Sequence, residues 1–295
     1  MKVSVVVANW NGLKLLKKNF PQLIASANFA KNAIYEVIVV DNGSQDDSLK
    51  YLTGLNFLKL KVIKNNKNMG FPVAVNQGVK LAKGDIICSL NNDVAPTKNF
   101  LEEALGLFGD ESVFAISLHE KGEGPSVGKF EAGYIGFTRG VEKGKVQSSF
   151  WASGGSGLFR KKYWDKLGGF DEMFSPGYWE DLDLCYRARK RGYSILWSPD
   201  SLVFHKHESS YTLLAKSYIS LVKERNQLLM MWKDITSRKL LWLHLIGLVS
   251  RLVRHPGYIK VVVALISKLP GVVSDRRLEK HESVVTDEEI LGLKS

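Results

Sequence analysis

The chain contains little cysteine, which limits the ways it can be cross-linked. Its 295 residues include two cysteines, Cys88 and Cys185. Two cysteines cannot form a disulfide framework or a zinc site built from four thiolates. This usage is typical of a protein from a reducing compartment. A hydrophobic content of 45% with 24% charged residues excludes a disordered chain and a pure coiled coil.

Long hydrophobic runs and a secretory leader are also missing. No stretch reaches eighteen uncharged apolar residues, so a membrane-spanning helix is not expected. The first apolar run, residues 3–8, is too short for the core of a signal peptide. We therefore expect the protein to stay on the cytoplasmic side.

Two common phosphate-binding motifs do not occur. No G-x-G-x-x-G follows the first apolar run, and no G-x-x-x-x-G-K-[ST] is found anywhere in the chain. Dinucleotide-binding and P-loop interpretations therefore lose their main support.

The N-terminal hundred residues alternate between strand-like and helix-like segments. Runs that are apolar on both faces are typical of parallel strands covered by helices on each side. The predicted strands are residues 3–8, 36–41, 58–63 and 85–90, and the predicted helices are 13–27, 45–52 and 71–82. This alternation predicts a doubly wound, mostly parallel α/β sheet.

The pattern weakens between residues 99 and 160, where clustered glycines indicate surface loops. Structure is predicted again at 159–167 and as a helix at 180–191, which ends before Gly192. Two short strands are expected to follow, at 193–197 and 202–205.

Positive charge is concentrated near the C-terminus. The net charge is +11, and residues 206–280 carry fourteen Lys and Arg against five Asp and Glu. Apolar residues recur there at helical spacing, among them Leu213, Leu228 and Trp242. Apolar helices flanked by cations favour attachment to an anionic membrane surface, and the alternative is a helical appendix packed on the main domain. We predict domains at 1–210 and 211–280, with an acidic, flexible end at 281–295.

Polar residues follow three predicted strands at the edge where ligands bind in open α/β sheets. They are Asn9, Asp41 and the pair Asn92–Asp93. Asp41 is suited to a nucleobase or ribose, and Asp93 to Mg²⁺ or Mn²⁺ through hard oxygen ligation. Taken singly, each Asp could instead be a turn former or helix cap, and Ser44 could cap the helix at 45–52.

A dense acidic cluster opens the helix at 180–191. Glu180, Asp181 and Asp183 follow Trp179, whose ring can stack on a sugar. The helix dipole alone explains one acid in a first turn, but three beside aromatic residues indicate a site where a carboxylate takes a proton from a hydroxyl. His205 ends a strand and is either an imidazole ligand or part of a surface histidine pair with His207.

The ordered set of these motifs resembles family 2 glycosyltransferases over roughly residues 3–210. The resemblance is carried by V-I-V-V-D-N-G-S at 37–44, N-x-G-F at 68–71, L-N-N-D at 90–93, G-G-F-D-E at 168–172, W-E-D-L-D-L at 179–184, P-D at 199–200 and His205. The set is most similar to the rhamnosyltransferase-like branch.

This resemblance implies a GT-A fold with a C-terminal amphipathic helical extension and inverting transfer from a nucleotide-sugar. By analogy Asp41, Asn9 and Asn92 contact the donor, and Asp93 and His205 hold a divalent metal. The resemblance implies that Asp181 is the general base, and Glu180 is the nearest alternative for that role. It also implies that Trp179 and Glu180 bind the acceptor. The first acid of the D-x-D motif is Asn91 here, a neutral and weaker ligand.

The resulting expectation is a transferase that uses dTDP-rhamnose or a UDP-hexose, with Mn²⁺ or Mg²⁺. Its expected acceptor is a glycan or a polyprenyl-diphosphate-linked sugar, met at the cytoplasmic face of the membrane during cell-surface glycan assembly. The alternative is a catalytically idle nucleotide-sugar or glycan-binding module, which Asn91 would favour. No nucleic-acid partner is expected, because the charge excess lies in an apolar helical region without a nucleic-acid-binding motif.

Overall fold

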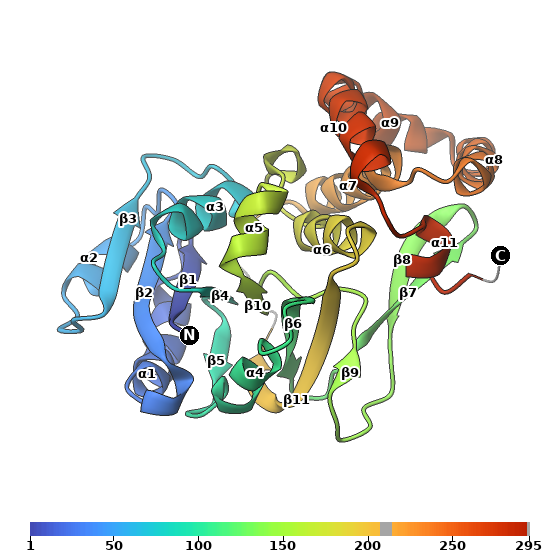
Figure 1. Ribbon diagram of the computed structural model, residues 1–295. Helices are drawn as coiled ribbons and strands as arrows, with labels where there is room; N and C mark the ends of the chain where they lie inside the picture. The colour runs from blue at the N-terminus through green and yellow to red at the C-terminus, as the bar shows by residue number, and fades with distance from the viewer. Residues whose placement is uncertain (207–213, 294–295) are drawn as a thin grey trace.

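A nine-stranded sheet lies at the centre of the part of the chain that the computed structural model describes, residues 1–206 and 214–293 (Figure 1). Its strand order is β3-β2-β1-β4-β10-β6-β11-β5, and β9 pairs with β11 at the side. The strands are β1 (Val3–Asn9), β2 (Ile34–Asp41), β3 (Leu60–Lys64), β4 (Ile86–Asn91), β5 (Val94–Pro96), β6 (Val113–Glu120), β9 (Gln147–Ser148), β10 (Ser156–Arg160) and β11 (Ser194–His205).

The sheet is mostly parallel. Strands β3, β2, β1 and β4 all run in the same direction, and β6 is parallel to β11. The strand β10 is antiparallel to both β4 and β6, and β5 is antiparallel to β11. The α/β class expected from the sequence is therefore confirmed, including all four N-terminal strands.

Helices cover both faces of the sheet because alternate residues of its strands point to opposite sides. In β1, Val5 and Val7 belong to the core under α1, α2 and α4, whereas Val6 belongs to the core under α3, α5 and α6. The bounds are α1 (Leu13–Ala27), α2 (Ser48–Thr53), α3 (Phe71–Leu81), α4 (Glu102–Leu107), α5 (Lys161–Leu167) and α6 (Glu180–Lys190). Full burial on both faces explains the continuous apolar runs.

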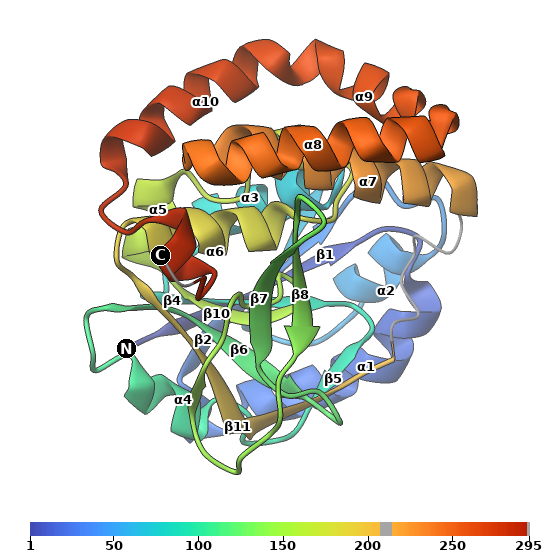
Figure 2. The same cartoon turned by 90° about the vertical axis from the view of Figure 1, so that its right-hand side faces the viewer.

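The C-terminal helices form a further layer over α6 (Figure 2). They are α7 (Lys216–Asp234), α8 (Arg238–Arg254), α9 (Ile259–Leu265) and α10 (Leu269–Glu282). The short α11 (Asp287–Ile290) lies below this layer and contacts α6 (Figure 1). A third core cluster joins α7 to α6 through Leu228, Leu182 and Tyr186, and to the antiparallel hairpin of β7 (Ser126–Glu131) and β8 (Tyr134–Arg139) through Ile135. The predicted boundary at residue 210, together with His207 and Leu213, lies outside the described residues.

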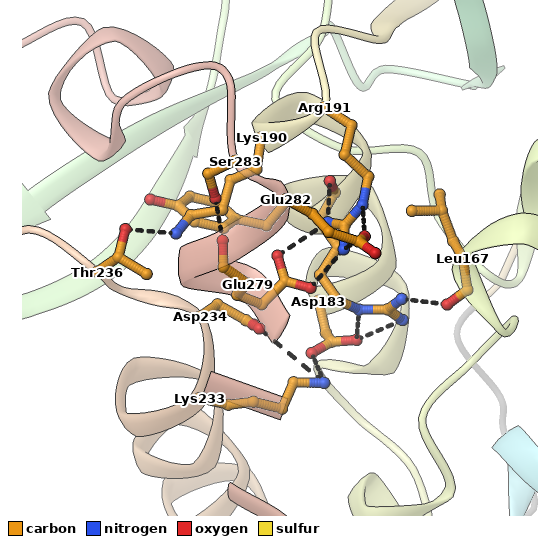
Figure 3. Close-up of polar contacts among 12 residues, drawn as sticks. Leu167, Asp183, Lys190, Arg191, Lys233, Asp234, Thr236, Glu279, Glu282 and Ser283 are labelled. Carbon is orange, nitrogen blue, oxygen red and sulfur yellow. Dashed lines mark hydrogen bonds and ion pairs between the residues drawn. The ribbon is translucent and has the colours of Figure 1, made fainter. Parts of the chain in front are cut away.

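Buried ion pairs reinforce this contact (Figure 3). Asp183 of α6 pairs with Arg187 on its own helix at 2.8 Å and with Lys233 of α7. Arg191, which follows α6, reaches Glu279 of α10 at 2.9 Å. A buried charge left without its partner is strongly destabilising. The pairs therefore hold α6 in one position against α7 and α10.

Three parts of the chain differ from the sequence-based expectations. The region from 99 to 160 is not mainly loop, because it holds α4, β6, the hairpin and β10. β11 is one strand of twelve residues with a register shift between Ser198 and Leu202, where two strands were expected. The helix α2 begins at Ser48 after the N-cap Asp47, so Ser44 does not cap it.

The acidic end is not solvated throughout. Asp287 is buried, and its carboxylate accepts hydrogen bonds from the Tyr186 hydroxyl at 2.8 Å and from the backbone N–H of Ser237 at 2.6 Å. It also lies 3.2 Å from the buried ammonium of Lys190. The expectation of a flexible tail was wrong at this residue. The hydrogen bonds and the ion pair of the Asp287 carboxylate offset the free-energy cost of removing it from water.

One described helical stretch is long and apolar enough to cross a membrane by length and composition alone. It is Pro256–Glu282, whose most apolar window has a mean hydropathy of 1.5 and is 22% buried. Within it, Val261 and Leu265 pack in the third core cluster and Glu279 pairs with Arg191. The stretch lies along α7 in this structure.

Candidate active site

A cleft of about 600 Å³ opens at the carboxyl ends of β1 and β4. Seven of the eight residues predicted for the site line it: Asn9, Asn92, Asp93, Trp179, Glu180, Asp181 and His205. The parallel strands end at one edge of the sheet, which explains why residues so distant in sequence meet there. The eighth, Asp41, does not line the cleft.

Asp41 lies behind Asn9 and orients it. Only 1% of Asp41 is exposed, and its Oδ1 accepts from Asn9 Nδ2 at 3.0 Å and from the Ser44 hydroxyl at 2.6 Å. Asn9 Oδ1 in turn accepts from Asn92 Nδ2 at 2.8 Å. This chain of hydrogen bonds fixes the amides that face the cleft.

Asp93 forms the floor of the cleft with two other titratable side chains. His205 Nε2 lies 3.2 Å from Asp93 Oδ1, and its Nδ1 lies 3.0 Å from Glu120 Oε1. Burial lowers the pKa of His205, but hydrogen bonds to the two carboxylates outweigh burial and raise it to about 9. The imidazole is therefore a cation between two carboxylates, not a member of a surface histidine pair.

Asp181 stands at the start of α6 and faces the same cleft. Its Oδ2 accepts from the backbone N–H of Gly154 at 2.8 Å, and its Oδ1 accepts from the N–H of Leu182 at 2.8 Å. Burial raises the pKa of Asp181 to about 6, although these backbone hydrogen bonds act to lower it. A carboxylate with this pKa can both take and release a proton near neutral pH.

The pKa of the neighbouring Glu180 is shifted as well. Burial, and then the charge of Asp181, raise the pKa of Glu180 well above its usual range. Its Oε2 is buried and makes no hydrogen bond to any described residue. Glu180 therefore favours its protonated form more strongly than a free glutamate does, which makes it the less suitable base beside Asp181.

The other end of the cleft is aromatic and basic, and sequence reasoning largely missed it. Phe137 and Trp151 pack with ring centroids 5.2 Å apart, and the ammonium of Lys223 lies 4.4 Å from the centroid of Tyr178. The Trp151 Nε1 is buried and has no hydrogen-bond acceptor among the described residues. Flat aromatic rings that line a cleft are suited to packing against a sugar face.

Glu120 was missed as well. It ends β6, inside the region where loops were expected. The run V-F-A-I-S-L at 113–118 is as apolar as the four strands that were identified, and Glu120 ends that strand as Asp41 ends β2. This apolar run could therefore have predicted strand β6 and, at its end, Glu120.

Comparison with known sequences identifies the family. The sequence model of Glycosyl transferase family 2 matches residues 4–168, more than half of the chain. The chain belongs to this family. The match contains the strand ends that carry Asn9 and Asp93, and it stops before α6.

Curated relatives of this chain are also glycosyltransferases. A pre-mycofactocin glycosyltransferase of Mycobacterium tuberculosis is 31% identical over 186 residues, 59% of this chain and 38% of the relative. The glycosyltransferase AglE of Haloferax volcanii is 25% identical over 219 residues, 73% of this chain and 70% of the relative. The chain thus spans well under half the length of the mycobacterial relative.

Solved structures confirm the GT-A-like fold. TarS 1–349 of S. aureus superposes with a TM-score of 0.57 at 18% identity, covering 99% of this chain and 83% of that one. The mannosyltransferase PcManGT of Pyrobaculum calidifontis, solved with GDP-Man and Mn²⁺, has a TM-score of 0.58 at 14% identity, with 95% and 84% covered. At such identities the likeness establishes the fold alone.

The site fits a divalent cation in part. Asp93 Oδ2 is buried and has no hydrogen-bond donor among the described residues. A carboxylate with an imidazole beside it is a donor set that Mn²⁺ and Mg²⁺ accept. Within residues 1–206 and 214–293, no three His, Cys, Asp or Glu side chains form a complete metal cluster. The protein would therefore share the ion with another ligand.

Proposed function

We propose that this glycosyltransferase transfers a sugar with inversion from a nucleotide-diphosphate donor to a hydroxyl of a lipid-linked or polysaccharide acceptor in cell-surface glycan assembly. dTDP-rhamnose and UDP-hexoses are the donors we favour. The observation that carries the proposal is one cleft with Asp181, whose pKa of about 6 suits a base, and the separate carboxylate of Asp93.

Single displacement at the anomeric carbon needs one base and no covalent nucleophile. Asp181 removes the proton of the acceptor hydroxyl as that oxygen attacks the sugar. Trp179 and Glu180 hold the acceptor, the first by stacking and the second by hydrogen bonding. Asn9 and Asn92, oriented through Asp41, bind the donor.

Asp93 and His205 would hold the divalent metal, with Glu120 beside them. The metal supplies charge neutralisation for the departing diphosphate. Because His205 is a cation between two carboxylates in this structure, it must lose its proton to become a ligand.

A thermal-shift panel tests the donor site. Purified protein is melted with Mn²⁺ and each of UDP, dTDP, GDP and CDP. A nucleotide present at 100 times its Kd should add about 2.7 kcal/mol to the free energy of unfolding. We expect stabilisation by one nucleotide that depends on Mn²⁺, is lost in Asp93→Ala and is retained in Asp181→Ala. No stabilisation of a well-folded sample by any nucleotide would instead favour an idle module.

We also propose that the protein works at an anionic membrane surface, attached by the outer faces of α8 and α9. Trp242, Ile246, Val249 and Val253 form one exposed stripe along α8, at intervals of three and four residues. Ile259 and Val263 are exposed as well, on α9. Arg238, Lys239, Arg254 and Lys260 are exposed cations on the same helices. Apolar side chains flanked by cations suit a lipid surface that carries negative charge.

Co-sedimentation with vesicles tests this attachment. Full-length protein should pellet with phosphatidylglycerol vesicles and far less with phosphatidylcholine vesicles. The double variant Trp242→Ser/Ile246→Ser should stay in the supernatant. The matched control Leu58→Ser/Val141→Ser removes two exposed apolar side chains outside the stripe and should pellet normally. Equal pelleting of both variants would refute the proposed face, and retention in cell membranes after alkaline extraction would point to a span at 256–282.

A further inference from the structure

The turn that leads into α6 is strained at two consecutive aromatic residues. Tyr178 and Trp179 have φ angles of 73° and 77°, in the left-handed region. This conformation costs an L-residue with a side chain about 1–2 kcal/mol. Such residues persist only where their surroundings hold them. Both rings line the cleft.

The side chain of Asn226, from α7, makes three hydrogen bonds to this turn. Asn226 is fully buried, and its Nδ2 donates to the carbonyl oxygens of Phe174 at 2.7 Å, Gly177 at 2.9 Å and Tyr178 at 2.8 Å. Two N–H groups serve three acceptors, so one hydrogen is shared. The Phe174 carbonyl also accepts from the backbone N–H of Gly177 at 3.1 Å, so it is the carbonyls of Gly177 and Tyr178 that depend on Asn226 for a donor, and loss of a donor inside the protein is costly.

Arg225 supports Asn226 from the neighbouring position. Its Nε and Nη2 donate to Asn226 Oδ1 at 2.9 and 2.7 Å, and Nη2 also donates to the carbonyl of Ser175 at 2.7 Å. This contact orients the amide so that its nitrogen faces the turn. The pair thus binds four carbonyl oxygens between residues 174 and 178.

The turn determines where α6 begins. Trp179 is the N-cap residue, and its carbonyl accepts from the N–H of Asp183 at 2.9 Å. Asp181 lies two residues beyond the cap. A change of φ at Tyr178 or Trp179 would therefore rotate the first turn of α6 and move the Asp181 carboxylate from Gly154.

We propose that Asn226, supported by Arg225, is a positioning residue of the transfer reaction. It keeps the 174–179 turn in its left-handed form, and so places Asp181 for proton removal and the two rings for the acceptor. The inference rests on the proposed role of Asp181 as the base. It makes α7 a part of the catalytic unit, although the composition of this helix predicts membrane attachment.

Water can replace the acceptor in the test. UDP-GlcNAc, UDP-glucose, GDP-mannose and dTDP-rhamnose are each incubated with Mn²⁺, and release of nucleoside diphosphate is measured. The donor that wild type hydrolyses fastest is used for the variants. Because a misplacement of about 1 Å can cost 10²-fold in rate, we expect Asn226→Ala to lower kcat at least tenfold. The Kd of the matching nucleoside diphosphate should stay within twofold, and Arg225→Ala should show a smaller loss of kcat.

The matched control is Gln227→Ala. This amide follows Asn226 on α7, and it donates to the carbonyl of Ile135 on the hairpin at 2.8 Å, away from the turn. It should keep kcat within twofold. Amide hydrogen exchange provides a second measurement, independent of turnover. Exchange at residues 174–182 should accelerate in Asn226→Ala and not in Gln227→Ala.

The outcomes separate this inference from the proposed function. Wild-type hydrolysis by Asp181→Asn would overturn Asp181 as the base, and the inference with it. An inactive Asp181→Asn beside an Asn226→Ala of normal kcat would overturn the inference alone. Unchanged exchange at 174–182 in Asn226→Ala would overturn it even if no donor is hydrolysed. An equal loss of donor affinity and kcat would show that Asn226 only stabilises the fold.

Discussion

At the scale of single residues, burial and neighbouring charges give three adjacent carboxyl groups different protonation states. Burial and the charge of Asp181 raise the pKa of Glu180 far above its usual value, and burial raises the pKa of Asp181 to about 6. Burial acts on Asp183 in the same direction, but the charges of Arg187 and Lys233 outweigh it and lower the pKa of Asp183. The pKa of about 6 brings the charge change of Asp181 close to neutral pH.

We predict that kcat falls as the pH falls through about 6. A base must be deprotonated to accept a proton, so the rate is full above the pKa of Asp181 and decreases about tenfold for each pH unit below it. A pH–rate profile of nucleoside diphosphate release measures this. Asp181→Asn should be inactive at every pH. A profile that stays flat from pH 8 to pH 5 would contradict Asp181 as the base.

At the scale of elements, a lysine of α7 supplies a positive charge that pairs with a buried carboxylate of α6. The ammonium of Lys233 is almost fully buried and contacts the carboxylates of Asp183 and, at 2.7 Å, Asp171. We predict that Lys233→Met lowers the free energy of unfolding by about 3–5 kcal/mol, because it removes the cation shared by Asp171 and Asp183 and leaves the buried Asp183 carboxylate with Arg187 alone. Urea denaturation measures the change. Lys239→Met, on the exposed face of α8, should change it by less than about 0.5 kcal/mol, and equal effects would disprove the argument.

The hairpin and α8 approach each other through two glycines, Gly133 and Gly247. A Cβ on Gly247 would lie 2.3 Å from the carbonyl oxygen of Ala132. We predict that Gly247→Ala separates the hairpin from α8 and destabilises the protein by about 1–3 kcal/mol. Gly106→Ala, inside α4 with no atom within 4 Å of its Cβ, should be neutral or slightly stabilising. Thermal melts compare the two, and a similar shift in both would contradict close packing as the cause.

The N-terminal strands and their polar ends were predictable because each strand is buried on both faces and ends in a polar residue. The contacts that the C-terminal residues make with α6 could not be predicted from the sequence. Asp287 looks solvated in an acidic tail, and only the distant Lys190 and Tyr186 make its burial favourable. The sequence around Asn226 does not reveal its role either, because the three carbonyl oxygens to which it donates lie about fifty residues earlier in the chain. Long-range polar contacts leave no periodic pattern in the sequence.

At the scale of the whole molecule, the catalytic domain and the C-terminal helices share one core. Leu182 and Tyr186 of α6 pack in the same cluster as Leu228 of α7 and Leu265 of α9. Lys190, at the end of α6, is fully buried, with its charge met by Asp287. Because these contacts join the two predicted domains, we expect residues 1–210 not to be independently stable.

We predict that a chain ending at residue 210 does not fold, because deletion exposes the apolar side of α6 and leaves Asp183 without Lys233 and Lys190 without Asp287. Circular dichroism should show no cooperative melt. A chain ending at residue 284 keeps α7 to α10 and loses α11, the Asp287 contacts and Leu291 of the third core cluster, so it should fold with a lower Tm than the full chain. A cooperative melt of residues 1–210 at the full-length Tm would instead establish the catalytic domain as a separate unit. The C-terminal helices would then be an attachment, and the contacts of α7 with the 174–179 turn would be dispensable for the fold.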